Sequence, residues 1–341
     1  MLTNSRGLDD IIFIIGHPRT GTTLLHNLLS SDSEHFYYVN TFQCGFPSSF
    51  LWFEKIGKYL FQGVIDKKRP MDNMDLHFDL PQEDELAVNM LSGGCSYYMP
   101  LWFMKQEHQF RYYLAFNQED SYSLGKNIDE EKTRWTNAFT YFIKKISLRE
   151  RLSRKNSMKR RLILKSPVHT AKVELLRRIF PKAKFIYIHR DPYEVFQSAV
   201  HMADTTYWYS YLNTPTEEQI LAFIYWQFEH MFKAYNAAAI CSHGPDDGTR
   251  VLHKDVLEVG YRLDLIDNPV QTLHRIYRHV LTTDIPSVDE LAIKYKLQVQ
   301  DMSKYVVNKH PATIPVAIKQ TIESRWKEYF ITFKYIMSKY N

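Results

Sequence analysis

The chain has 341 residues, of which 45% are hydrophobic and 15% aromatic, and its formal net charge is +5. This composition excludes a mainly disordered chain, because the apolar fraction can offset the entropy of ordering. No fixed-period repetition occurs in the sequence, which excludes coiled-coil, collagen-like and repeat architectures. The net charge suits anionic ligands but is too small to indicate nucleic-acid binding by itself.

Three cysteines, Cys44, Cys95 and Cys241, lie far apart and form no Cys-x-x-Cys pair. We therefore expect neither a disulfide framework nor a zinc site, and the odd number of thiols favours a reducing compartment. Residues 1–10 are polar, unlike a signal peptide, and no uninterrupted apolar run reaches the ~18 residues of a membrane span. The sequence predicts a cytoplasmic protein, or a membrane-anchored or Golgi protein if an N-terminal anchor precedes these residues.

The first predicted element is a strand over residues 11–15, where five consecutive β-formers indicate burial on both faces of a parallel sheet. A glycine-containing loop follows over residues 16–21. Residues 22–30 (TTLLHNLLS) have leucines on one face and predict a helix. Strand, loop and helix in this order begin a βαβ unit.

A second unit has the order strand, turn, helix, strand, helix. Its predicted elements are a strand over 162–164, a turn at 165–167, a helix over 170–180, a strand over 185–188 and a helix over 193–202. Asp191 and Pro192 suit the N-cap and first turn of the last helix. The spacing implies right-handed parallel crossovers, so the sequence predicts a three-layer α/β fold with a central parallel sheet flanked by helices.

The rest of the chain is interpreted as helical insertions and additions. Residues 40–150 are predicted to be largely helical, with dense aromatics between 97 and 113, and the remaining predictions are a helix over 216–240, a strand at 250–252, and helices over 270–281 and 321–340. Trp326, Phe330 and Phe333 share one face of the last helix. No linker rich in glycine, serine or proline interrupts the sequence, so residues 1–341 are predicted to form one domain.

A phosphate-binding loop is predicted between the first strand and helix, where residues 16–23 read GHPRTGTT. Gly16 and Gly21 have the G-x4-G spacing, and the helix N-terminus adds backbone N–H groups and a favourable dipole for an anion. A kinase loop has lysine directly after the second glycine, where this sequence has Thr22, and the cation here is Arg19. An arginine can grip a phosphosulfate in bidentate fashion. The alternative is a tight turn without a ligand.

A second anion site is predicted after the 185–188 strand. Arg190 follows this strand at its carboxyl end, where parallel α/β sheets bind ligands, and Ser198 lies two helical turns further on. One cation and one hydroxyl suit a second phosphate. In isolation, the same residues would fit an N-capped helix with a surface arginine.

Together these segments resemble the sulfotransferase family. The similarity is close over residues 11–30 and 162–200 and continues more weakly to about residue 281. The LKSPVH turn looks like that of the bacterial-type, Golgi-like branch. The resemblance implies a P-loop-like sulfotransferase domain with donor-binding elements in those two segments and an acceptor-side helical insertion at about 40–150. It also implies 3′-phosphoadenosine 5′-phosphosulfate (PAPS) as co-substrate and supplies no metal.

The resemblance assigns the donor-binding residues one by one. The 5′-phosphosulfate would be held by Arg19 and by the loop residues Thr20, Gly21, Thr22 and Thr23, and the 3′-phosphate by Arg190 and Ser198. Thr22 and Thr23 also suit helix N-capping. Lys165, in the matching lysine turn, would stabilise the bridging oxygen as it leaves, since positioning and charge stabilisation dominate such a displacement.

The general base is at neither position familiar in the family. Cytosolic members have His two residues after the strand lysine, where this sequence has Pro167, and the segment that matches the Golgi-type Glu reads NTFQ. A Pro-x-Glu-Asp segment similar to one in bacterial-type members lies at residues 81–84. Glu83 or His77 is therefore the candidate base, and His169 is a weaker one. The alternative is an acid-rich, capped helix N-terminus.

The acceptor is expected to carry a hydroxyl on a small or lipid-like molecule. Aromatics at 97–113 and 207–211 either line its pocket or pack in the core. No nucleic-acid partner is expected, and helical surfaces of this class often pair, which leaves room for a homodimer. Two alternative functions stay open: a P-loop kinase that uses ATP, which Thr22 disfavours, and a non-catalytic nucleotide-binding scaffold, which the missing base favours.

Two further features have no assigned role. Residues 144–161 contain nine basic residues and one acid, Glu150, and could contact an anionic acceptor, a membrane surface or nucleic acid, or simply form a solvated helix and loop. The Lys-Gly-x-x-Gly loop of cytosolic relatives, which adds contacts to the 3′-phosphate, is missing after residue 281. Lys304, Lys309 and Arg325 are candidates to replace it.

Overall fold

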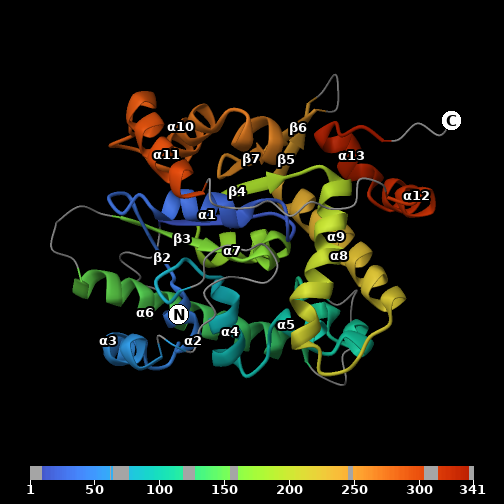
Figure 1. The fold of residues 1–341 in the computed structure, drawn as a ribbon, viewed down its shortest axis with the longest axis horizontal. Helices are drawn as coiled ribbons and strands as arrows, with labels where there is room; N and C mark the ends of the chain where they lie inside the picture. The colour runs from blue at the N-terminus through green and yellow to red at the C-terminus, as the bar shows by residue number, and fades with distance from the viewer. Residues whose placement is uncertain are drawn as a thin grey trace.

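The computed structural model describes residues 10–61, 63, 77–117, 127–153, 160–244, 249–302 and 314–337. Its core is a five-stranded parallel sheet in the order β2-β3-β1-β4-β7 (Figure 1). The strands are β1 (Ile11–Ile15), β2 (Phe36–Tyr38), β3 (Arg161–Lys165), β4 (Lys184–His189) and β7 (Val256–Gly260). The predicted α/β fold with a central parallel sheet is confirmed.

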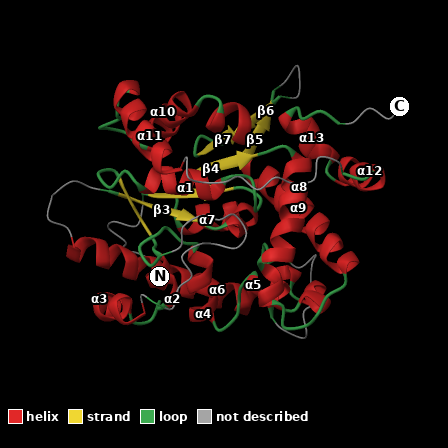
Figure 2. Ribbon diagram, viewed as in Figure 1, coloured by secondary structure: helices red, strands yellow, loops and turns green. Residues whose placement is uncertain are grey.

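Helices dominate the rest of the described chain (Figure 2). Those between β2 and β3 are α2 (Thr41–Gly45), α3 (Phe50–Phe61), α4 (Asp84–Ser92), α5 (Tyr98–Trp102) and α6 (Ile128–Ser153). The others are α1 (Thr22–Ser30), α7 (Val173–Ile179), α8 (Pro192–Thr205), α9 (Glu217–Ala239), α10 (Pro269–Val280), α11 (Val288–Met302), α12 (Val316–Arg325) and α13 (Lys327–Phe333). None of these described helices is long and apolar enough to cross a membrane.

Short helical segments and one strand pair complete the description. Four are 3₁₀ turns, η1 (Met104–Gln109), η2 (Arg111–Tyr113), η4 (Pro167–Lys172) and η5 (Tyr207–Ser210), and η6 (Tyr261–Ile266) is π-helical. Strands β5 (Ile240–His243) and β6 (Arg250–Leu252) form a separate antiparallel pair.

The side chains of β1 alternate between two helical layers. Ile12 belongs to a buried cluster that includes Leu25 of α1 and Ile276 of α10. Phe13 faces the other way, in a cluster with α6, α7 and α9, and its ring centroid lies 6.4 Å from that of Phe139 on α6. The burial of β1 on both faces therefore follows from helices packed on each side of the sheet.

Three predicted elements differ from the structure. The 250–252 strand exists as β6 but pairs outside the core sheet, and the fifth core strand, β7, was not predicted. The predicted 170–180 helix is a 3₁₀ turn followed by the shorter α7. The predicted C-terminal helix breaks at Trp326 (φ −104°, ψ 19°), whose ring stacks on Phe228 at 3.8 Å between centroids. Packing against α9 thus overrides the helical pattern.

Candidate active site

The phosphate-binding loop predicted between β1 and α1 needs glycine at two positions. Gly16 (φ +147°) and Gly21 (φ +99°) have positive φ. A Cβ atom at Gly16 would lie 2.6 Å from the carbonyl oxygen of Ile188, and one at Gly21 would collide with the ring of Tyr261. The left-handed backbone of Arg19 (φ +75°) costs about 1–2 kcal/mol, which surrounding contacts must offset.

Side chains hold this loop in its conformation. The backbone N–H of Gly16 donates to Thr170 Oγ1 (2.8 Å), and the Thr170 hydroxyl donates to the Gly16 carbonyl (3.0 Å). Thr20 Oγ1 donates to the His17 carbonyl at 2.8 Å. Burial lowers the pKa of His17 to about 4, so its imidazole is neutral at neutral pH. The protein itself thus fixes the loop, as a preorganised anion site requires.

The two predicted phosphate sites are in direct contact. Arg19 Nε donates to Ser198 Oγ (2.9 Å), and Arg190 Nη1 donates to the Arg19 carbonyl (3.1 Å). The Arg190 guanidinium lies 4.4 Å from the ring centroid of Tyr261, and its Nε donates to Glu194 at 2.7 Å. The loop after β1 and the helix after β4 therefore meet through their polar side chains.

The C-terminal helix α13 holds the backbone of Arg190 in place. The buried hydroxyl of Tyr329 on α13 accepts a hydrogen bond from the Arg190 backbone N–H (3.0 Å) and donates one to its carbonyl (3.2 Å). Burial raises the pKa of Tyr329 well above its ordinary value, which keeps the hydroxyl protonated. Arg325 forms an ion pair with a glutamate of α9 (2.6 Å), and Lys304 and Lys309 lie outside the described residues.

Lys165 and Glu83 meet beside the loop. Lys165 ends β3 and is buried, and its Nζ lies 2.6 Å from Glu83 Oε1 and 3.3 Å from Thr23 Oγ1. Glu83 occupies the N-cap position of α4, and its side chain keeps 29% of its exposure. A carboxylate that is partly open to solvent and bonded to an ammonium group can exchange partners when a substrate arrives.

The two residues after Glu83 anchor it to the protein core. Asp84 is fully buried, and its Oδ2 lies 2.7 Å from His169 Nε2 in the turn that follows β3. Glu85 is also buried and accepts a hydrogen bond from Trp135 Nε1 at 3.1 Å. Both acids hold the first turn of α4 against the interior, while Glu83 stays on the open side.

The three candidates for the base have different surroundings. Glu83 contacts Lys165, whereas His77 is exposed and its Nδ1 accepts a hydrogen bond from the backbone N–H of Asp79 (3.3 Å). His169 is buried against Asp84. The acid-rich helix N-terminus considered as an alternative is also present, because Asp84 and the next residue form the first turn of α4.

The supporting roles of six residues around the site were not predicted from the sequence: Asp84, Glu85, Thr170, Glu194, Tyr261 and Tyr329. The run of three acids at residues 83–85 was the available signal. If two of these carboxylates are buried, they need polar partners in the interior, and the partners would then form part of the site. The remaining contacts join segments far apart in the chain, which no local pattern reveals.

The dense aromatics at 97–113 mostly pack in the core. Tyr97, Tyr112 and Tyr113 are buried. Tyr98 is partly exposed, and burial together with the negative charge of Glu83 raises its pKa. Its backbone N–H donates to Ser96 Oγ (3.3 Å), and the Ser96 hydroxyl donates to Glu85 (2.9 Å), two residues after the candidate base. The Tyr98 ring stacks with Trp102 at 6.1 Å between centroids. Part of the aromatic cluster therefore borders the site.

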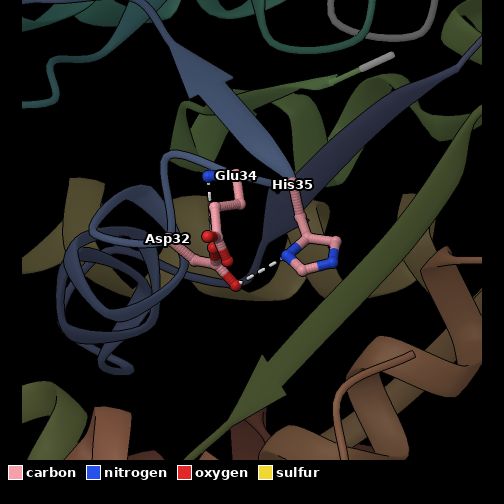
Figure 3. A group of neighbouring side chains, drawn as sticks. All are labelled: Asp32, Glu34 and His35. Carbon is pink, nitrogen blue, oxygen red and sulfur yellow. Dashed lines mark hydrogen bonds and ion pairs between the residues drawn. The ribbon is translucent and has the colours of Figure 1, made fainter. Parts of the chain in front are cut away.

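A separate group of side chains contains residue types that bind metals (Figure 3). Asp32, Glu34 and His35 offer ligand atoms within 4.8 Å of one another, and His35 Nδ1 lies 2.9 Å from Asp32 Oδ2. The ammonium of Lys294 lies 3.1 Å from Asp32 Oδ2 and 3.2 Å from Glu34 Oε2, and Tyr277 donates to Asp32 at 2.7 Å. A protein cation thus bridges both carboxylates, which joins the α1–β2 turn to α10 and α11.

Comparison with known proteins decides the family. The profile of the sulfotransferase family matches residues 10–284. This chain belongs to the sulfotransferase family. A similar curated protein is the omega-hydroxy-beta-dihydromenaquinone-9 sulfotransferase Stf3 of Mycobacterium tuberculosis and of Mycobacterium bovis, which is 29% identical over 328 residues, covering 96% of this chain and 76% of the relative.

Two solved sulfotransferases share the fold. STF9 from Mycobacterium avium aligns with a TM-score of 0.59 at 16% identity, covering 97% of this chain and 78% of that one. STF1 from Mycobacterium tuberculosis aligns with a TM-score of 0.55 at 20% identity, covering 94% and 77%. The P-loop-like fold expected from the resemblance is therefore confirmed.

The sulfotransferase is an enzyme that transfers a sulfonate group, and its family uses PAPS as co-substrate. The kinase and scaffold alternatives are set aside on this ground. The enzyme's loop agrees with the assignment, because its cation is Arg19 within the loop while Thr22 occupies the kinase lysine position.

Proposed function

We propose that this sulfotransferase transfers a sulfonate group from PAPS to a hydroxyl of a lipid-like acceptor, with Glu83 as general base. The observation that carries the proposal is the contact of Lys165 Nζ with Glu83 Oε1 (2.6 Å) and Thr23 Oγ1 (3.3 Å). A base and a cation that meet at the start of a phosphate-binding helix suit group transfer to an incoming hydroxyl.

The donor is held by the two contacting anion sites. Arg19 and the loop N–H groups bind the 5′-phosphosulfate, and Arg190 with Ser198 binds the 3′-phosphate. The hydrogen bond between Arg19 and Ser198 (2.9 Å) supports this, because it makes both sites parts of one polar surface. The Arg190 guanidinium exchanges its pairing with Glu194 for the stronger charge of the 3′-phosphate.

The transfer step is an in-line displacement at sulfur. The acceptor oxygen forms a new bond to sulfur as the bond from sulfur to the 5′-phosphate oxygen breaks, and the electron pair of that bond stays on the phosphate. Lys165 stabilises the charge on this leaving oxygen. When Lys165 turns to the donor, Glu83 is freed to accept the proton of the acceptor hydroxyl. The products are the sulfate ester and 3′-phosphoadenosine 5′-phosphate (PAP), and Glu83 returns its proton to solvent.

A lipid-like acceptor is supported by two observations. The similar Stf3 proteins are named for an omega-hydroxylated menaquinone, which is a lipid-like molecule that carries a hydroxyl. The negative charge of Glu83 acts on Tyr98 of α5, whose ring stacks with that of Trp102, and the exposed Trp208 belongs to η5, which packs against α5. Aromatic rings of this kind pack against apolar chains while a polar group reaches the base.

Calorimetry with PAP and with ATP plus Mg²⁺ tests the donor, and transfer of labelled sulfonate from PAPS tests the acceptor. We expect tight PAP binding, weak ATP binding and faster transfer to a long-chain omega-hydroxylated quinol than to a short alcohol. Preference for ATP would contradict the donor. PAP binding with faster transfer to the short alcohol would contradict only the lipid-like acceptor.

A further inference from the structure

The outer face of helix α3 carries four large, exposed hydrophobic side chains that no described residue covers. Trp52, Ile56, Tyr59 and Leu60 are 75%, 60%, 74% and 60% exposed, at the spacing that places side chains on one helix face. Scattered exposed apolar residues are ordinary, but four large ones in contiguous turns of one helix mark an interaction surface.

Helix α6 lies against α3 (Figure 1). Arg149 of α6 donates to Glu54 of α3 (2.9 Å), and the rings of Phe50 and Phe142 lie 6.1 Å apart. The outward side chains of α6 from this contact region include Tyr141, Leu148 and Leu152, at 51%, 39% and 73% exposure. We call the exposed side chains of α3 and of α6 from Thr136 onward the α3–α6 surface.

The charged groups of the α3–α6 surface are all basic. Lys55, Lys144 and Arg151 are exposed, while the acids of these two segments, Glu54 and Glu150, are buried in ion pairs with basic partners. No acid is exposed among the described residues of α3 or of α6 from Thr136 to Ser153. Apolar, aromatic and basic side chains, with no exposed acid on either helix segment, complement a layer of anionic lipid headgroups.

We propose that the α3–α6 surface docks this enzyme on an anionic membrane, with Trp52, Ile56 and Leu60 inserted at the level of the headgroups. Burial of the apolar side chains supplies affinity, and the basic side chains contact lipid phosphates. Trp52 and Tyr59 have the amphipathic rings that favour the membrane interface.

The docking helix is joined directly to the segment that carries Glu83. Glu54 of α3 accepts a hydrogen bond from Asn40 Nδ2 (3.0 Å), and Lys58 of α3 pairs with Asp79 at 2.5 Å. The Cys44 thiol of α2 donates to the Glu83 carbonyl at 3.3 Å. A lipid-like acceptor that leaves the membrane at α3 therefore enters near the general base, a step that rests on the proposed function.

Vesicle sedimentation tests the docking. The full chain is mixed with vesicles of phosphatidylcholine alone and with vesicles that also contain phosphatidylglycerol. We expect binding to the anionic vesicles that falls with added salt, and about a tenfold or greater loss in the Ile56→Glu and Leu60→Glu variants. Ile331→Glu, at a site of equal exposure (61%) on α13, keeps full binding.

A second pair of variants guards against misfolding as the cause. Lys144→Glu weakens binding to anionic vesicles and leaves binding to neutral vesicles unchanged, whereas Lys327→Glu on α13 changes neither. PAP binding, measured in parallel, is retained in all variants, so failure of docking and failure of the proposed function are separable.

Three outcomes would overturn the docking proposal. One is an absence of vesicle binding, and another is equal binding by Ile56→Glu, Ile331→Glu and the unmodified chain. The third is a dimer in sedimentation velocity that Ile56→Glu dissociates, which would assign the α3–α6 surface to a second copy of the chain.

Discussion

Arg19 donates from its Nε to the hydroxyl of Ser198 across 2.9 Å, although 179 residues separate them in the sequence. The arginine comes from a left-handed position in the loop after β1, and the serine is buried in α8. This hydrogen bond connects the groups proposed to bind the two ends of the donor. Loss of the protein groups that bind either end should therefore lower the affinity for the whole donor.

The arginine substitutions test the donor site. Arg19→Ala and Arg190→Ala should each weaken PAP binding by about 1.5–3 kcal/mol, tenfold or more, because each removes a charge-assisted contact. Calorimetry measures the effect. Arg262→Ala removes an arginine whose side chain is 75% exposed and should bind PAP normally. Unchanged affinity in both Arg19→Ala and Arg190→Ala would contradict the assignment of the donor site.

Glu83→Gln tests the general base. The variant should bind PAP as the unmodified enzyme does and lose about two orders of magnitude or more in kcat, because the amide cannot accept the acceptor proton. Glu229→Gln is the matched control, since Glu229 is 23% exposed and pairs with Arg325 at 2.6 Å, much as Glu83 pairs with Lys165. Full turnover by Glu83→Gln would transfer the role to His77.

Glu194→Gln tests the exchange at Arg190. Removing this carboxylate should tighten PAP binding by a few fold, because an exposed ion pair contributes at most about 1 kcal/mol to the donor-free state. The control is Glu174→Gln, which removes an equivalent pair with Arg178 (3.4 Å) on α7. Weaker PAP binding in Glu194→Gln would show that Glu194 supports Arg190 instead of competing for it.

Asp84→Asn tests the anchoring of Glu83. We expect kcat to fall about tenfold or more while the KM for PAPS stays unchanged, along with a stability loss of about 1–3 kcal/mol. Glu131→Gln controls for stability alone, because Glu131 is also buried but bonds Tyr113 and Cys95. Equal losses of kcat in both variants would indicate a general effect of destabilisation.

The buried imidazole of His17 gives the fold a dependence on pH. Its folded pKa of about 4 lies below the ordinary histidine value of 6.5, so between these values the unfolded chain binds a proton that the folded chain does not. The free energy of unfolding therefore falls as the pH falls through this window, by roughly 2 kcal/mol at pH 5 relative to pH 7.

Urea unfolding at both pH values measures this dependence. His17→Gln lacks the titrating group and should lose about 2 kcal/mol less than the unmodified chain between the two pH values. His243→Gln, at an exposed site, should lose as much as the unmodified chain. Parallel losses in His17→Gln and the unmodified chain would assign the acid sensitivity to other groups.

Local patterns predicted the parts of the site that are local. The loop at 16–23 and the Asp191 cap of α8 depend on neighbouring residues, and both were read from short segments. The core strand β7 was missed because its VLEVG segment contains a glutamate and a glycine and lacks the continuous apolar run of a buried strand, and its place in the core follows only from pairing with β4. The pairing of Asp84 with His169 joins residues 85 positions apart, which no periodicity encodes.

The hydrogen bonds of Tyr329 to both backbone polar groups of Arg190 set an order on folding during synthesis. The strand β1 and its loop leave the ribosome early, yet Arg190 gains its support only after residue 329 has been made. Contacts of such long sequence separation form late, since their loop-closure entropy must be offset first. A nascent chain stalled short of α13 would carry a formed phosphate loop and an unsupported partner site, and so should not retain the donor.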